Sequence, residues 1–293
     1  MPSKPPAQVP LGNSRAAFDA SPYASLKLST YFDVYDRLLA PFVGRNVTFV
    51  EVGILHGGSL WMWRGFLGPH ARIIGVDVNP DAVRWREHGF EVFIGDQSDP
   101  AFWQSFFEEV GPVDVLLDDG GHTFEQQVVT TESALPYVRD GGLVIVEDVI
   151  SSYMPEFLGP SRNSFVAYTK HLMDRIHARH DFGFSVGEVE DTVLAMHVHQ
   201  SLVALEVNRE ACTKPSTIVW NDGAQVGAED YREALIASSF DWTQLRRLGH
   251  LAPRGVRRIV ARTLLPLHRR FALWRSNRRA RRAFQLRKDL NTH

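Results

Sequence analysis

Short apolar segments alternate with stretches of helical pattern between residues 48 and 149. Several of the apolar segments are apolar throughout, as expected for strands whose two faces are both covered. Strands that alternate with helices of this length form parallel sheets with right-handed crossovers, so the pattern predicts an α/β fold. The predicted strands are Thr48–Gly53, Arg72–Val78, Glu91–Ile94, Val113–Asp119 and Leu143–Val149, and the predicted helices are 58–67, 80–88, 100–110 and 123–138.

The flanking segments complete this outline. A helical pattern over 26–42 predicts a lid helix before the first strand, and a long helix is expected near 161–180. Two later segments, Val193–Val198 and Leu202–Val207, are expected to pair antiparallel at the sheet edge. The predicted organisation is a flexible arm at 1–24, a domain with its N-terminal lid helix at 25–210, an irregular extension at 211–252 and a basic amphipathic tail at 253–293.

Charge is distributed unevenly along the chain. Residues 254–293 carry 13 Lys and Arg against one acid, while the preceding residues have a net charge of −14. A basic amphipathic stretch is expected either to pack against its own domain or a second subunit, or to contact an anionic membrane or a polyanion. We expect packing, a homo-oligomer and no specific nucleic-acid binding. The single cysteine and the lack of a long apolar run predict a cytoplasmic protein, with peripheral contact at the inner membrane face as the alternative.

A glycine-rich turn follows the first predicted strand. Gly53, Gly57 and Gly58 lie in this turn, which leads directly into a helix beginning near Ser59. Glycines at the carboxyl edge of such a sheet let the backbone approach a ligand, and the helix N-terminus offers free N–H groups. Simple turn chemistry is the alternative explanation. We predict that Glu51, Gly53, Gly57, Gly58 and Ser59 bind a nucleotide cofactor.

The next two strands also end in polar residues. Asp77 lies 24 residues after Gly53, where an acid can accept hydrogen bonds from both ribose hydroxyls. The alternative, a helix N-cap, is better served by Asn79 or Asp81. Asp96 and Gln97 follow the third strand, where they can contact an adenine. All three strand ends therefore predict a nucleotide site.

Glu51 indicates which nucleotide binds. Its carboxylate, two residues before Gly53, is unfavourable beside a pyrophosphate but suits a cationic ligand. The turn also lacks the G-x-G-x-x-G pattern of dinucleotide-binding proteins. Both features favour S-adenosylmethionine over a dinucleotide.

Acids gather at the ends of the fourth and fifth strands. Asp118 and Asp119 end one, Glu147 and Asp148 end the other, and His122 follows two glycines. Four carboxylates that converge at one sheet edge repel each other unless a cation lies among them, and oxygen ligands favour Mg²⁺. A solvated acidic rim is the alternative for the acids, and a helix cap is the alternative for His122.

The order and spacing of these motifs resemble one known family. The segments E-V-G-x-x-x-G-G-S, D-V-N, D-D-G-x-H and V-E-D are similar to those of the metal-dependent sugar O-methyltransferases, a family that includes macrolide deoxysugar and rhamnosyl O-methyltransferases and has cephalosporin hydroxylase-like relatives. The resemblance covers about residues 25–210. It implies a class I S-adenosylmethionine-dependent fold, Rossmann-like, with a seven-stranded mainly parallel sheet, a helical lid and here a basic helical tail.

The resemblance also implies residue roles. Asp119, Glu147 and Asp148 would hold Mg²⁺, His122 would be the general base, and Asp118 is assigned to the cofactor side. The implied reaction is methyl transfer from S-adenosylmethionine to a sugar hydroxyl of a glycoside, glycolipid or polysaccharide. Relatives often carry Ser at the position of Gly121, and macrolide members have a long N-terminal auxiliary domain where this chain has about 47 residues before the first strand. The walls of the acceptor pocket therefore do not carry over.

Two alternative functions remain open from the sequence. One is O-methylation of an aromatic vicinal diol, which uses the same chemistry on a different acceptor. The other is a non-catalytic accessory protein that binds the nucleotide without turnover.

Overall fold

The computed structural model describes residues 11–179, 191–217, 219–224 and 227, together with positions 270, 274, 277, 278, 280 and 281. The chain divides into two compact units, Met1–Ile218 and Val219–His293, and every predicted site residue lies in the first.

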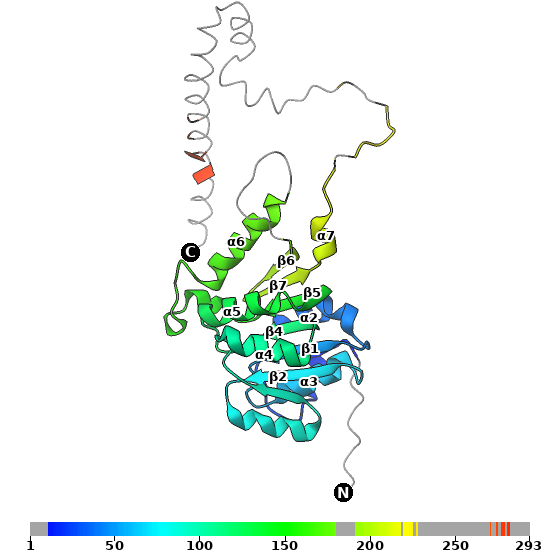
Figure 1. The fold of residues 1–293 in the computed structure, drawn as a ribbon, viewed down its shortest axis with the longest axis vertical. Coiled ribbons are helices and arrows are strands. Elements are labelled where there is room, and N and C mark those ends of the chain that lie inside the picture. Colours follow the sequence, from blue (N-terminus) through cyan, green and yellow to red (C-terminus); the bar gives the residue numbers. More distant parts are fainter. Residues whose placement is uncertain are drawn as a thin grey trace, which may run out of the picture. The chain divides into compact units, whose positions relative to one another are not determined.

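A seven-stranded sheet forms the centre of the first unit, in the order β3-β2-β1-β4-β5-β7-β6 (Figure 1). The five strands β1 to β5 are parallel, and β7 pairs antiparallel with both β5 and β6. This arrangement confirms the predicted α/β fold and its antiparallel edge. The strands are β1 Thr48–Val52, β2 Arg72–Asp77, β3 Glu91–Ile94, β4 Val113–Asp118, β5 Val138–Val146, β6 Val193–His199 and β7 Leu202–Val207.

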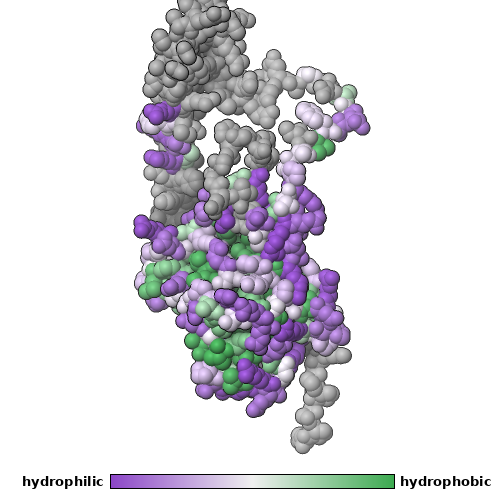
Figure 2. Space-filling view, in the orientation of Figure 1, coloured by the Kyte–Doolittle hydropathy of each residue, from purple (hydrophilic) through white to green (hydrophobic). Residues whose placement is uncertain are grey.

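Helices cover both faces of the sheet, which explains why the central strands are apolar throughout. One buried cluster joins the sheet to α1, α2 and α3, and the other joins it to α4, α5 and α6. The face drawn in Figure 2 is mostly polar, with smaller apolar areas between. The helices are α1 Ser14–Asp19, α2 Tyr31–Leu38, α3 Gly58–Leu67, α4 Pro100–Val110, α5 Phe124–Ala134, α6 Phe165–Ala178 and α7 Arg209–Thr213, with short 3-10 helices η1 Ala40–Phe42, η2 Pro80–His88, η3 Val149–Tyr153 and η4 Pro155–Phe157.

Local sequence fixes where several helices begin. Asn79 accepts a hydrogen bond from Asp81 N and caps η2, as the sequence indicated. A capping box between Thr123 and Gln126 begins α5, so His122 is not the cap of that helix. The segment 80–88 is a 3-10 helix rather than an α-helix. Its two buried residues, Ala82 and Trp85, are three positions apart, which matches three residues per turn.

The N-terminal segment differs most from the prediction. Residues 14–19 form α1, with buried Ser14 donating a hydrogen bond to Phe32 O, so this part of the predicted arm is ordered helix. The predicted lid helix over 26–42 begins only at Tyr31. Residues 21–30 contain no helix, and residues 24–28 line the cavity at the strand ends. The side chains of Ser21 and Lys27 make hydrogen bonds to residues far away in the sequence.

Most of the predicted extension and tail lies outside the described residues. The described positions 270, 274, 277, 278, 280 and 281 are helical, and the Arg278 guanidinium lies 5.5 Å from the centre of the Trp274 ring. Within the part of the chain that the structure describes, no helix is long and apolar enough to cross a bilayer.

Candidate active site

A cavity of about 520 Å³ opens at the carboxyl edge of the parallel strands. Its lining includes the residues that follow β1, β2, β3, β4 and β5, because parallel strands all end at the same edge. The segment 24–28 and Tyr31 of α2 close it from the N-terminal side. The volume is that of a site for a small cofactor with part of a substrate.

Gly53 is the glycine that the turn most requires. Its φ of +82° lies in the left-handed region, and a Cβ built there would come within 2.2 Å of Asp119 O. Asp119 N in turn donates a hydrogen bond to Val52 O. The absence of a side chain at Gly53 thus lets the ends of β1 and β4 meet beside the cavity.

Asp77 lines the cavity and also shapes the turn. Its Oδ2 accepts hydrogen bonds from Ile54 N at 3.0 Å and Leu55 N at 3.2 Å, and its Oδ1 accepts one from Asn79 N at 2.8 Å. A carboxylate has about four lone-pair positions, so Asp77 keeps acceptor capacity toward the cavity. Its position therefore supports two roles, in the turn and toward a ligand.

Asp96 and Gln97 also line the cavity. Asp96 Oδ1 accepts hydrogen bonds from Ser98 N and Ser98 Oγ, which lower the pKa of the Asp96 carboxyl. Gln97 is buried, donates to Asp118 Oδ1 at 2.9 Å and accepts from Gly121 N at 2.8 Å. Gln97 thus fixes the loop after β4 that carries the acids.

Three other predicted cofactor residues contact protein. A Cβ on Gly57 would meet the Trp85 ring, and one on Gly58 would meet Tyr23 O and Ala24 O. Both glycines therefore make room for neighbouring chain. Ser59 lines the cavity and donates a hydrogen bond at 2.7 Å to Glu51, which is completely buried.

Asp118 is also almost completely buried, at 1% exposure. Burial raises the pKa of its carboxyl to about 6, against the opposing hydrogen bonds from Gln97 and Gly120 N. Its Oδ2 has no hydrogen-bond partner. Asp118 therefore stabilises the loop after β4 through its hydrogen bond from Gly120 N, while Asp119 lines the cavity.

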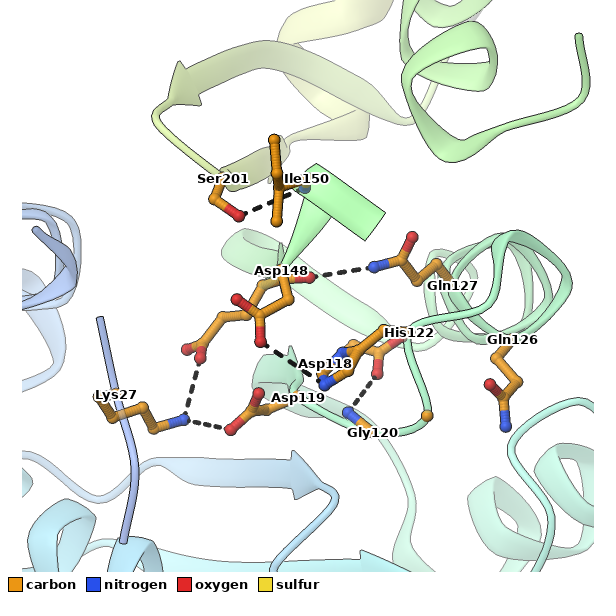
Figure 3. Close-up of polar contacts among 12 residues, drawn as sticks. Lys27, Asp118, Asp119, Gly120, His122, Gln126, Gln127, Asp148, Ile150 and Ser201 are labelled. Carbon is orange, nitrogen blue, oxygen red and sulfur yellow. Dashed lines mark hydrogen bonds and ion pairs between the residues drawn. The ribbon is translucent and has the colours of Figure 1, made fainter. Parts of the chain in front are cut away.

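Asp119, His122 and Asp148 form the polar centre of the site (Figure 3). Each offers one ligand atom, and these atoms lie within 4.8 Å of one another. His122 Nε2 is 3.5 Å from Asp148 Oδ2, and the buried His122 Nδ1 has no hydrogen-bond partner. The carboxylate oxygens of Asp119 and Asp148 fit a hard divalent cation such as Mg²⁺, whereas an imidazole nitrogen is more typical of transition-metal sites.

Glu147 lies deeper than these three residues. It is completely buried, and its side chain accepts hydrogen bonds from Tyr35 Oη and from Lys27 Nζ at 3.0 Å. Burial raises the pKa of Glu147 to about 8, while Lys27 opposes the shift. Gln127 Nε2 donates to the Glu147 carbonyl and fixes the backbone. The structure thus places Glu147 beside the cluster of Asp119, His122 and Asp148, with its carboxylate turned toward Lys27.

The sequence did not predict Lys27. Its ammonium lies 2.7 Å from Asp119 Oδ2 and 3.0 Å from Glu147 Oε2 (Figure 3). It also lies 3.6 Å from Glu51 Oε1, and its side chain is 1% exposed. Burial lowers the pKa of Lys27, but the three carboxylates outweigh burial and hold it well above its ordinary value. One signal was available, because Lys27 is the only lysine between residues 5 and 169 of an acidic region.

Two tyrosines of α2 were also missed. Tyr31 Oη lies 2.8 Å from Asp148 Oδ1 and accepts a hydrogen bond from Asp148 N, while Tyr35 reaches Glu147. Burial raises the pKa of both hydroxyls, so they act as neutral donors. Their spacing of four residues places them on one helix face, and that spacing was the available signal.

The fold and the strand-end site together define a class I methyltransferase domain. Residues 50–149 match the family model described as "Methyltransferase domain". The predicted fold class and the predicted resemblance are therefore both confirmed.

Several relatives are sugar O-methyltransferases. The chain is 33% identical to the 8-demethyl-8-alpha-L-rhamnosyl tetracenomycin-C 2'-O-methyltransferase of Streptomyces olivaceus over 61% of this chain and 50% of that protein. It is 31% identical to demethylmacrocin O-methyltransferase of Streptomyces fradiae, over 60% of this chain and 48% of that protein. The chain thus spans about half the length of these curated relatives.

A solved structure is similar over a larger part of the chain. The MycE methyltransferase from the mycinamycin biosynthetic pathway, in complex with Mg, SAH and mycinamycin VI, superposes with a TM-score of 0.62. The two sequences are 25% identical, and the alignment covers 80% of this chain and 60% of MycE.

Proposed function

We propose that this protein transfers a methyl group from S-adenosylmethionine to a sugar hydroxyl of a glycoside, glycolipid or polysaccharide, with Mg²⁺ as its metal. The observation that carries the proposal is the cluster of Asp119, His122 and Asp148 at the edge of the strand-end cavity. The same cavity is lined by acids suited to a nucleoside. The relatives named above act on sugar-containing compounds, which supports the acceptor class.

The cofactor side is assigned to the ends of β1, β2 and β3. Asp77 would accept hydrogen bonds from the ribose hydroxyls, and Asp96 and Gln97 would border the adenine. Gly53 leaves the backbone open to close approach. Four aspartates line the cavity against the single ammonium of Lys27, so its field favours a cationic sulfonium ligand; they are Asp77, Asp96, Asp119 and Asp148.

The metal would be held by Asp119, Glu147 and Asp148, with His122 beside it. When bound, Mg²⁺ supplies Lewis acidity that makes a coordinated hydroxyl more acidic. His122 Nε2 would accept the proton of the acceptor hydroxyl, and Asp148 Oδ2, 3.5 Å from that nitrogen, would stabilise the imidazolium that results. Tyr31 in turn holds Asp148 in place through its hydroxyl. The methyl acceptor would thus be positioned by residues of two neighbouring strand ends.

A methyl-transfer assay tests the proposal. The purified chain would be incubated with radiolabelled S-adenosylmethionine and a panel of rhamnosyl and deoxysugar glycosides, glycolipids and oligosaccharides, with catechol as the aromatic diol. We expect label in a sugar acceptor, loss of transfer in EDTA and recovery on addition of Mg²⁺. Transfer to catechol alone would change the acceptor class. Cofactor binding without transfer to any acceptor would support an accessory protein instead.

We also propose that the basic tail packs on protein, either on its own domain or on a second copy of the chain, rather than on a membrane. The net charge of +12 in 254–293 against −14 in the rest of the chain supports such pairing. A variant lacking 254–293 should lose stability, or light scattering should show that it forms assemblies with fewer subunits than the full chain does. A variant with the same number of subunits and the same stability that no longer binds anionic liposomes would favour the membrane.

A further inference from the structure

Lys27 brings a positive charge to the centre of a group of buried acids. Its ammonium is within 3.0 Å of both Asp119 Oδ2 and Glu147 Oε2, and 3.6 Å from Glu51 Oε1. All four side chains are mostly or completely buried, with Asp119 the most exposed at 20%. In such surroundings charge interactions are stronger than in water, so Lys27 is the main counterion of this group.

The backbone that carries Lys27 is held in place from several sides. Ser21 Oγ donates a hydrogen bond to Gly58 O, and the carbonyl oxygens of Tyr23 and Ala24 lie so close to Gly58 that a Cβ there would come within 2.4 Å of both. On the other side of Lys27, Tyr31 hydrogen-bonds Asp148. The segment 21–30 therefore delivers the ammonium to a fixed position, rather than as a mobile surface side chain.

Two of the carboxylates beside Lys27 are among the three assigned to the metal. Asp119 Oδ2 and Glu147 Oε2 contact the ammonium, while Asp119 also belongs to the cluster with His122 and Asp148. A divalent cation that uses Asp119 and Glu147 must share their oxygens with Lys27 or displace it. Like charges that share a carboxylate repel each other.

We propose that Lys27 is a positioning residue that competes with the divalent cation for Asp119 and Glu147. It holds these carboxylates together in the metal-free protein and weakens metal binding by its own charge. This inference rests on the proposed metal site. By linkage, a cation that weakens the contacts of Lys27 also loosens the hold on segment 21–30, which closes the cavity.

Titration calorimetry with MgCl₂ on the full chain, without cofactor, tests the competition. Lys27→Met removes the charge but keeps a long apolar stem. We expect Mg²⁺ to bind this variant about tenfold more tightly than the wild type, because the competing ammonium is gone. Lys170→Met is the matched control, since it makes the same charge change on the exposed side of α6 and should leave the affinity unchanged. A general loss of structure would weaken binding, so tighter binding is not a folding artefact.

A double variant covers the case in which Lys27→Met does not fold. Lys27→Met with Glu51→Gln removes one charge of each sign and leaves the net charge of the buried group unchanged. We expect this variant also to bind Mg²⁺ more tightly than the wild type. Equal or weaker binding by the folded variant, with the wild type still binding, would overturn the role of Lys27 and leave the metal site standing. No binding by the wild type or either variant would overturn both proposals.

Hydrogen exchange gives a second readout that needs no activity. Adding Mg²⁺ should speed amide exchange in 21–30 of the wild type, since the contacts of Lys27 are weakened. In Lys27→Met those contacts are already lost, so Mg²⁺ should leave exchange in 21–30 unchanged. Slower exchange in the wild type would contradict the competition, because it would mean that the cation and Lys27 reinforce each other.

Discussion

His122 Nε2 lies 3.5 Å from Asp148 Oδ2, and both residues hold left-handed backbone conformations, with φ of 60° and 51°. Such conformations cost about 1–3 kcal/mol for residues other than glycine and gather at functional sites. Neighbouring contacts hold Asp148 in this conformation, because its N–H donates to Tyr31 Oη and its carboxylate is bonded by the same hydroxyl. The pairing supports a base at His122 whose protonated ring Asp148 would stabilise.

Replacing His122 by Ala tests this role. We expect kcat to fall by about 10²–10⁴, the usual contribution of a general base, while SAH and Mg²⁺ still bind. Raising the pH should restore part of the rate, because hydroxide can take the proton. His171→Ala, on the exposed side of α6, is the control and should keep its rate. A normal kcat for His122→Ala would rule out the base, and steady-state kinetics with calorimetry measure both quantities.

Asp77→Ala should lower the affinity for S-adenosylmethionine at least tenfold, as calorimetry would measure. The substitution removes charge-assisted hydrogen bonds to the ribose, each worth about 1.5–3 kcal/mol. It also leaves Ile54 N and Leu55 N without their acceptor. Asp77→Asn keeps one acceptor oxygen, so its affinity for S-adenosylmethionine should lie between those of the wild type and Asp77→Ala. If Asp77→Ala bound as tightly as the wild type, Asp77 would not contact the ribose.

Gly53→Ala should both destabilise the protein and abolish cofactor binding. Its new Cβ would lie 2.2 Å from Asp119 O, so the ends of β1 and β4 must separate. Gly44→Ala is the matched control, because Gly44 also has a positive φ, +72°, but no atom lies within 4 Å of its Cβ position. The control should lower the free energy of unfolding by only the cost of holding alanine in the left-handed conformation, about 1–2 kcal/mol. Chemical unfolding should therefore give a clearly larger loss for Gly53→Ala, and similar losses would contradict the close approach.

Asp118 predicts a pH dependence of stability. Because burial raises its pKa from 3.8 to about 6, the folded protein binds more protons than the unfolded protein between these values. The contribution of Asp118 to the free energy of unfolding therefore falls as pH rises through this window, by up to about 3 kcal/mol. Asp118→Asn cannot titrate, so its stability relative to the wild type should rise from pH 4 to pH 7. Urea unfolding in EDTA measures this difference, and a constant difference would contradict the shift.

The sequence predicted residues that local patterns identify, and it missed residues whose contacts lie far away along the chain. Strands and their polar ends follow from local apolar patterns, so Asp77, Asp119 and Asp148 were found at the right edge of the sheet. Lys27 was missed because its partners Asp119 and Glu147 lie 92 and 120 residues away, and no local period records such contacts. For the same reason, the helical pattern at residues 26–30 predicted a helix that the structure does not contain. The course of this segment is set by tertiary contacts that override a helical pattern.

The metal ligands give the last prediction. If Asp119, Glu147 and Asp148 hold Mg²⁺, each change to the corresponding amide should weaken Mg²⁺ binding at least tenfold in calorimetry, because a charged oxygen ligand is lost. Turnover should stop in EDTA and return with Mg²⁺, while S-adenosylmethionine still binds. Glu109→Gln, on the exposed side of α4, is the control for the loss of one acidic charge. Glu147→Gln is the decisive variant, since Glu147 faces Lys27 and Tyr35. Unchanged Mg²⁺ affinity in Glu147→Gln would remove Glu147 from the ligand set and leave Asp119 and Asp148 as the carboxylate ligands beside His122.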